Sequence, residues 1–324
     1  MHNIKCNLPL IGNVSIKIID KNLYNFTKRQ FKNYIVSESK TSSGSRDFIS
    51  INTENFNNLN FDDIILGRNI KFKSNKLKVI KKSRVQNITY KYDFNDSLSL
   101  TIDLKKKSLF YLKNLIESEY SITHGLFYET ILYPIFSFYA LKSNYSLIHG
   151  SLLKFNNKYI VLTGLDGVGK SSLSNELVLK GAKILADNFV LYNGGNFIGL
   201  NMPIRIDLEN DTKENVIFED NNLKEILYEY CEDTPVKVEQ VYFLSIAEKF
   251  NIENIDINIV NQNWNLINNG ASEILGANVF NIPFLYQNSL SKTIDNSNLK
   301  YYSFSIPKGK INKATKEFIC QLNI

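Results

Sequence analysis

Nine residues in the middle of the chain, GLDGVGKSS at 164–172, have the types and the spacing that a phosphate-binding loop needs. They fit the pattern G-x-x-x-x-G-K-[ST], whose glycines let several backbone N–H groups turn toward one anion. An apolar strand is expected to end at Thr163 just before the loop, and an amphipathic helix to begin just after it. Because a helix N-terminus favours negative charge, the stretch predicts binding of a nucleotide's phosphates rather than a turn that binds nothing.

Each position of this loop has an expected role. Lys170 would reach the β and γ phosphates, and the hydroxyl of Ser171 would ligate Mg²⁺, so ATP and Mg²⁺ are the expected cofactors. The residues expected to hold the nucleotide are Gly164, Asp166, Gly167, Val168, Gly169, Lys170, Ser171 and Ser172.

Two flanking residues suggest what happens to the phosphate. Asp187 closes the run LVLKGAKILAD, so its carboxylate is expected at the end of a strand next to the loop, where it can take a proton from a hydroxyl over the γ phosphate. The other reading of Asp187 is a cap or turn former before Asn188. His149 ends the preceding strand and is either an active-site neighbour of Asp187 or a packed histidine.

The block HGSLLKFNNKYIVLTGLDGVGKSSLSNELVLKGAKILADN, residues 149–188, resembles the core of the HPr kinase/phosphorylase family and of the wider group of HPr-kinase-like proteins. In that family a His-Gly strand, a phosphate loop, a helix ending in Arg/Lys-Gly and a strand ending in Ala-Asp-Asp follow in this order. The resemblance implies that Lys170 and Ser171 bind phosphate and Mg²⁺, that Asp187 is the proton acceptor and that His149 sits beside it. It does not cover the N-terminal part of the chain.

This chain departs from the family pattern at two places. Asn188 stands where the family has a second aspartate, and its amide oxygen is the expected second Mg²⁺ ligand beside Ser171. The family's Glu-Ile-Arg-Gly run is only echoed by MPIRIDLE, which disfavours HPr itself as the acceptor. Arg205, the only arginine after the loop, either clamps the transferring phosphoryl group or forms a structural ion pair with Asp207 or another neighbour.

Other classes with this loop lack their partner motifs here. A thymidylate kinase would have the loop at its N-terminus and a lid with several arginines, a GTPase would have Asn-Lys-x-Asp, and an ABC-type ATPase would have Ser-Gly-Gly-Gln. The alternative that stays open is a nucleotide-binding regulator without transferase activity.

The hydrophobic periodicity divides the chain into three parts. Alternating runs up to about Leu112 predict a mainly antiparallel β domain over 1–113, and helical spacing that Gly125 and Pro134 are expected to break or kink predicts a helical connector over 114–144. Strands at 146–155 and 158–164, a helix at 170–180 stopped by Gly181 and a strand at 183–187 predict an α/β phosphate-loop domain of the HPr-kinase type over 145–324.

The segments after this core are less specific. VKVEQVYFLSI and NIDINIVN predict strands that extend the sheet, whereas NNLKEILYEYCED and GASEILGANVF predict short helices. Trp264 either stacks on an adenine or packs in the core. The ending IPKGKINKATKEFICQL is basic and amphipathic, and could dock on the N-terminal domain or on a partner.

Charge and composition limit the partners. The net charge of +6 is uneven, because residues 1–150 carry 22 Lys and Arg against 12 Asp and Glu. The lysines of NIKFKSNKLKVIKKSR, 69–84, alternate with apolar residues and predict a strand pair that is either a charged sheet edge or a docking surface for an acidic partner. Nucleic acid is disfavoured because no RNA-binding aromatic motif or helix-turn-helix pattern accompanies them.

Compartment and assembly are constrained more loosely. No run of 18 apolar residues and no export signal is present, and the three cysteines lie far apart, which disfavours a disulfide framework or a metal cluster. We expect a cytoplasmic P-loop kinase that transfers phosphate from ATP to a hydroxyl of a protein, a peptide or a small metabolite. Association of the chain with itself is left open.

Overall fold

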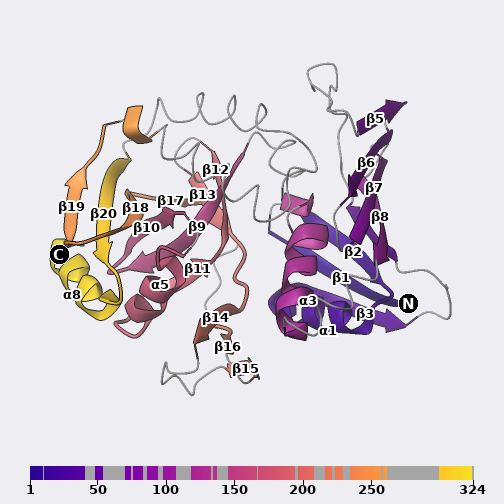
Figure 1. The fold of residues 1–324 in the computed structure, drawn as a ribbon, viewed down its shortest axis with the longest axis horizontal. Coiled ribbons are helices and arrows are strands. Elements are labelled where there is room, and N and C mark those ends of the chain that lie inside the picture. The colour runs from indigo at the N-terminus through magenta and orange to yellow at the C-terminus, as the bar shows by residue number, and fades with distance from the viewer. Residues whose placement is uncertain are drawn as a thin grey trace. The chain divides into compact units, whose positions relative to one another are not determined.

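The computed structural model has a mixed α/β architecture that is rich in antiparallel and mixed sheets (Figure 1). It describes residues 1–9, 11–40, 48–53, 70–73, 76–82, 86–93, 98–106, 118–132, 134–136, 145–165, 167–193, 196–207, 216–220, 223–228, 234–256, 258–260 and 299–322. These residues fall into two compact units, 1–136 and 145–322, which are treated separately below. Every helix in these ranges is too short or too polar to serve as a membrane-spanning segment.

The first unit is built on one eight-stranded antiparallel sheet. Its strands lie in the order β3-β1-β2-β4-β8-β7-β6-β5. The bounds are β1 His2–Leu8, β2 Gly12–Ile18, β3 Ile35–Lys40, β4 Phe48–Thr53, β5 Ile70–Lys73, β6 Lys76–Lys82, β7 Gln86–Asp93 and β8 Leu98–Lys106. In β1 the side chains of Ile4, Cys6 and Leu8 are buried while Lys5 and Asn7 are exposed, which is the alternation that one covered sheet face requires. The lysine-rich pair β5 and β6 is antiparallel, as its alternation predicts.

Helices cover this sheet, and the first of them was not predicted from the sequence. Helix α1 (Lys21–Gln30) begins at Asp20, whose carboxylate accepts hydrogen bonds from two backbone N–H groups of the first turn. It is followed by the 3₁₀ turn η1 (Lys32–Tyr34), and α3 (Glu119–Phe127) continues into a wider π-helical turn, η2 (Tyr128–Leu132). Phe26 of α1 contacts Tyr120 and Phe127 of α3.

Of the break or kink expected at Gly125, the break is wrong. Gly125 lies inside α3, which ends two residues later. A glycine inside a helix costs only about 1 kcal/mol relative to alanine. The buried face of α3 against α1 offsets that cost.

The second unit contains a mixed sheet in the order β17-β13-β12-β9-β10-β18-β20-β19, with β11 pairing β9 off this path. The bounds are β9 Ser146–Phe155, β10 Lys158–Gly164, β11 Lys183–Ala186, β12 Phe189–Asn193, β13 Asn196–Gly199, β17 Val236–Lys237, β18 Gln240–Ala247, β19 Asn251–Asn254 and β20 Lys300–Pro307. The pairs β10–β18 and β18–β20 are parallel, so three neighbouring strands end at the same edge. The prediction that VKVEQVYFLSI extends the sheet beside the loop is confirmed.

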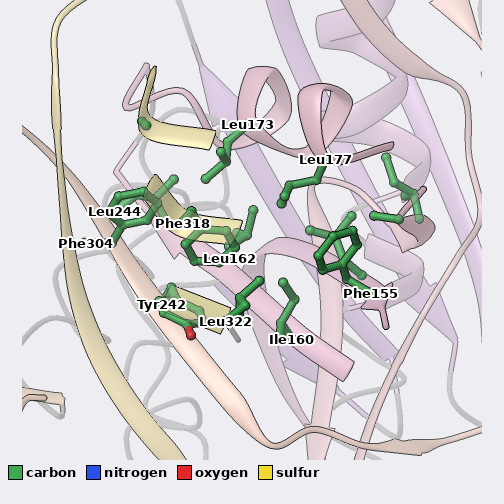
Figure 2. Close-up of a cluster of buried hydrophobic side chains, with 14 of the residues drawn as sticks. Phe155, Ile160, Leu162, Leu173, Leu177, Tyr242, Leu244, Phe304, Phe318 and Leu322 are labelled. Atoms are coloured by element: carbon green, nitrogen blue, oxygen red, sulfur yellow. The ribbon is translucent and has the colours of Figure 1, made fainter. Parts of the chain in front are cut away.

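Two helices pack on one face of this sheet. Helix α5 (Lys170–Val178) and helix α8 (Ile311–Leu322) cover a buried cluster. Figure 2 shows Leu173 and Leu177 of α5 and Phe318 and Leu322 of α8 in this cluster, together with side chains of the strands. A second buried cluster, which includes Val161, Val241 and Phe243, lies on the opposite face of the sheet, because successive side chains of a strand point to opposite faces.

A small three-stranded sheet adjoins α5. Its strands are β14 Ile204–Asp207, β16 Leu223–Ile226 and β15 Val216–Glu219, paired in the order β14-β16-β15. Ile204 and Ile226 belong to the same buried cluster as Leu173 and Leu177 of α5. This packing holds the small sheet beside the helix that follows the predicted phosphate loop.

Two segment predictions are wrong. Leu223–Ile226, within NNLKEILYEYCED, is a strand and not a helix, because these residues pair with β14 and bury Ile226 beside α5. Within NIDINIVN, residues 258–260 form a helical turn, which Asp256 caps by accepting the N–H of Asn258. GASEILGANVF and Trp264 lie outside the described residues.

Candidate functional site

The backbone between β10 and α5 has a conformation that favours glycine at three positions. Gly164, Gly167 and Gly169 have φ values of 151°, 76° and 94°. A Cβ at Gly164 would also lie 2.6 Å from the backbone oxygen of Leu244 in the neighbouring parallel strand. The loop therefore turns tightly at the end of β10, where β10 lies close to β18. Asp166 lies outside the described residues.

Lys170 is the first residue of α5 and is buried. Its Nζ donates to the backbone oxygens of Gly164 and Leu165 at 3.0 and 2.9 Å. The ammonium therefore lies over the start of the loop, at the N-terminal end of a helix. A cation and a helix N-terminus at one place favour the binding of an anion.

Asp187, directly after β11, joins strand β9 to helix α5. Its Oδ1 accepts a hydrogen bond from the Ser151 hydroxyl of β9 at 2.5 Å, and its Oδ2 accepts one from the Ser171 hydroxyl of α5 at 3.0 Å. Only 4% of Asp187 is exposed, and Ser151 is fully buried. The structure thus brings Lys170, Ser171 and Asp187 together at one end of α5.

The environment of Asp187 opposes its ionisation. Burial raises the pKa of its carboxyl group, while the hydrogen bonds from Ser151, Ser171 and the Asn188 backbone, and the charge of Lys170, act in the other direction. A carboxylate kept in such surroundings has a higher affinity for a proton than one in water. That property suits a group that accepts a proton during a reaction.

The other residues predicted around the loop differ in their contacts, backbone conformation and burial. His149 lies on β9 beside Phe189, with ring centroids 6.3 Å apart, and its backbone oxygen accepts the Thr163 hydroxyl. Asn188 has a φ of 72°, in the left-handed region where asparagine is enriched, and its backbone oxygen accepts the N–H of Gly150. Val168 packs against the buried cluster under α5, whereas Ser172 is exposed.

Arg205 is exposed on β14 and lies opposite Glu225 of β16. The preceding residue, Ile204, packs with Leu173 of α5, so the strand itself lies against the helix that carries Ser171. The structure therefore places β14 beside the site while the Arg205 side chain is open to solvent.

Three residues at this site were missed from the sequence. Ser151 holds Asp187 directly, and Tyr228 donates its hydroxyl to Oδ1 of Asn175, which lies one helical turn after Ser171. Burial and the nearby charge of Asp187 raise the pKa of Tyr228 to about 12. Ser151 could have been predicted from the sequence, because it lies two residues after His149 on the same strand and so on the same face of the sheet.

The donors at this site fit Mg²⁺ better than a metal held by protein alone. Within the described ranges no three His, Cys, Asp or Glu side chains are grouped for metal binding. Ser171 and Asp187 offer one hydroxyl and one carboxylate within hydrogen-bond distance of each other. Mg²⁺ is typically bound by one or two carboxylates together with substrate phosphates and water.

Comparison with known proteins adds little to this geometry. No family model matches the chain, and no curated protein matches it. Among solved structures, the chain is similar to the HPr(Ser) kinase/phosphatase from Coxiella burnetii, with 8% identity and a TM-score of 0.26. The match covers 54% of this chain and 95% of that chain. A likeness this distant carries no argument about activity, which has to be argued from the residues of the site.

Proposed function

We propose that this chain binds ATP with Mg²⁺ at the loop 164–172 and transfers the γ-phosphoryl group to a hydroxyl. The observation that carries the proposal is the 3.0 Å hydrogen bond between Ser171, directly after the loop lysine, and the buried carboxylate of Asp187. In nucleotide-binding loops of this type, the serine or threonine after the lysine ligates the metal, so a carboxylate hydrogen-bonded to that serine would lie next to the metal and the phosphates.

The residues divide the chemistry among them. Lys170 and the backbone N–H groups at the start of α5 would bind the phosphates and offset their charge. Ser171 would hold Mg²⁺ together with the amide oxygen of Asn188, and Asp187 would be the proton acceptor beside them. When bound, Mg²⁺ neutralises charge that develops on the phosphate oxygens.

The transfer step is a displacement at phosphorus. The acceptor oxygen bonds to the γ phosphorus, the bond from phosphorus to the bridging oxygen breaks, and ADP leaves. The acceptor hydroxyl gives its proton to the carboxylate of Asp187, which its burial suits to this task. His149 would orient this carboxylate, and Arg205, on the strand that lies against α5, would contact the transferring group.

One observation favours a second candidate, a nucleotide-binding regulator without transferase activity. Both carboxylate oxygens of Asp187 accept hydrogen bonds from serines, and the side chain is nearly inaccessible. A carboxylate in that state can order the loop around a nucleotide without meeting an acceptor. Such a protein would bind ATP and leave it intact.

The deciding experiment incubates the protein with γ-labelled ATP and cell extract, and identifies labelled products by mass spectrometry over a range of Mg²⁺ concentrations. The wild type should label a hydroxyl-bearing acceptor. Asp187→Asn should lose about 10²- to 10⁴-fold of the transfer rate, the usual contribution of a general base, with ATP affinity within a few-fold. Asp103→Asn, which changes a partly exposed aspartate of the first unit that pairs with Lys91, is the matched control.

Two other outcomes change the assignment. If excess Mg²⁺ partly restores the Asp187→Asn rate and ATP affinity falls with it, Asp187 is a metal ligand rather than the base. If the wild type binds ATP but labels nothing, the regulator is the better description.

A further inference from the structure

Two strands next to the loop extend beyond it. Gly164, the last residue of β10, pairs with Leu244 of β18, and Leu244 pairs with Phe304 of β20. β18 continues to Ala247 and β20 to Pro307, so three residues of each strand extend past the level of Gly164. In sheets of this kind, ligands bind outside the carboxyl ends of the parallel strands.

Exposed apolar side chains gather at this edge. Ile246 of β18 is 53% exposed, and Leu165, directly after β10, is 51% exposed. Gly164 pairs with Leu244, so Leu165 comes one residue after this pair, at the start of the loop, and Ile246 comes two residues after it on β18. Apolar groups that remain open beside a polar binding loop are suited to contact the flat face of a ligand ring.

A basic turn follows β20. Lys308 and Lys310 are exposed, and the turn is closed by a hydrogen bond from the N–H of Lys310 to the oxygen of Pro307. Ile311, the next residue, approaches the loop so closely that a Cβ at Gly169 would lie 3.3 Å from its Cδ1. The turn therefore places two lysines next to the phosphate loop, where they complement the charge of a polyphosphate.

We propose that the nucleoside end of the nucleotide binds at the carboxyl ends of β18 and β20, with Ile246 and Leu165 against the base and Lys308 and Lys310 near the phosphate closest to the sugar. The proposal rests on the function proposed above and deepens it. It assigns the first two lysines of the basic ending, Lys308 and Lys310, to the nucleotide site instead of to a docking surface. It follows from the continuity of this edge with the loop and from the charge of the turn.

The test compares two ligands by titration calorimetry in the presence of Mg²⁺, ADP and inorganic tripolyphosphate. Ile246→Ser should weaken ADP about fivefold to tenfold, because a base would lose an apolar contact, and should leave tripolyphosphate within twofold. Leu179→Ser is the matched control, since Leu179 is 52% exposed just after the other end of α5. The control should change neither affinity.

A second pair of variants tests the lysines. Lys308→Gln with Lys310→Gln should weaken both ligands about tenfold at low salt, and by less at high salt, because ionic contacts are screened. Lys180→Gln with Lys316→Gln removes the same charge from exposed positions elsewhere and should change affinity by less than twofold.

The outcomes separate this inference from the function on which it rests. Wild-type protein that binds ADP while Ile246→Ser binds it equally well would overturn the nucleoside site and leave the phosphate loop in place. Equal losses in both lysine pairs would overturn the role of the turn. Wild-type protein that binds neither ligand would reject the proposed function itself, and this site with it.

Discussion

Two carboxylates, one in each unit, each accept hydrogen bonds from two side chains, but their pKa values are shifted in opposite directions. Glu38 of β3 accepts hydrogen bonds from the Tyr24 hydroxyl at 2.6 Å and from Lys28 at 2.9 Å. Its side chain is 30% exposed, and these partners lower the pKa of Glu38. Asp187 also accepts two hydrogen bonds from side chains, but its burial raises its pKa.

The contrast indicates what each group is for. Glu38 gains from its partners and retains water, so its ionised form helps to hold α1 against β3. Asp187 is ionised only at a cost in free energy, which the fold could avoid with an amide or an apolar side chain. A buried acid that opposes folding and lies beside a cation and a glycine loop is a candidate for function.

Replacing the two carboxylates should have its most different effects on the rate of phosphoryl transfer. Asp187→Asn should reduce transfer by about 10²- to 10⁴-fold, whereas Glu38→Gln should leave it unchanged. The measurement is the initial rate with the acceptor found by mass spectrometry. Equal rates for wild type and Asp187→Asn would end the kinase mechanism proposed here.

Two lysines give the next comparison. Lys170→Ala should weaken binding of ATP with Mg²⁺ by about 100-fold, because the loop loses its cation and the phosphate charge is no longer offset. Lys28→Ala, which removes a lysine of α1, should leave the affinity unchanged. Calorimetry measures both, and a similar affinity for the two variants would show that the loop lysine does not bind the phosphates.

Replacing each of two glycines that have a positive φ should destabilise the protein by different amounts. Gly164→Ala should lower the free energy of unfolding by about 3 kcal/mol, because its Cβ would collide with the Leu244 oxygen. Gly12→Ala, whose Cβ would meet nothing within 4 Å, should cost about 1 kcal/mol from its φ alone. Urea denaturation distinguishes them, and equal losses would contradict the tight approach of β10 and β18.

The smallest expected effect is the pH dependence of Glu38. Because its folded pKa is lowered, its contribution to stability is present above the ordinary pKa and is lost as the pH falls through the lowered value. Since the group is exposed, Glu38→Gln should lower the free energy of unfolding by only about 0.5 kcal/mol at pH 7 and by nothing once the pH lies below the lowered pKa of Glu38. Stability curves that stay parallel across this range would argue against the ion pair.

The sequence predicted the elements around the loop closely because local signals define their ends. β9 and β10 are joined by a two-residue turn, Asn156 and Asn157, whose φ values of 46° and 63° match the turn that two asparagines favour. The strand at Leu223–Ile226 was missed because its helical spacing is overridden by pairing with β14. Helix α1 was missed although Asp20 was a readable capping residue. Tyr228 could not be found, because its partner Asn175 lies 53 residues away.

The central claim is that the loop and Ser171 bind a nucleotide together with Mg²⁺. The most direct measurement is titration of ADP into the intact wild-type chain and into Ser171→Ala, with and without Mg²⁺. The account predicts that Mg²⁺ strengthens binding to the wild type and has little effect on Ser171→Ala, because the serine hydroxyl would be a metal ligand. No binding by the wild type, or an equal Mg²⁺ effect in both proteins, would contradict it.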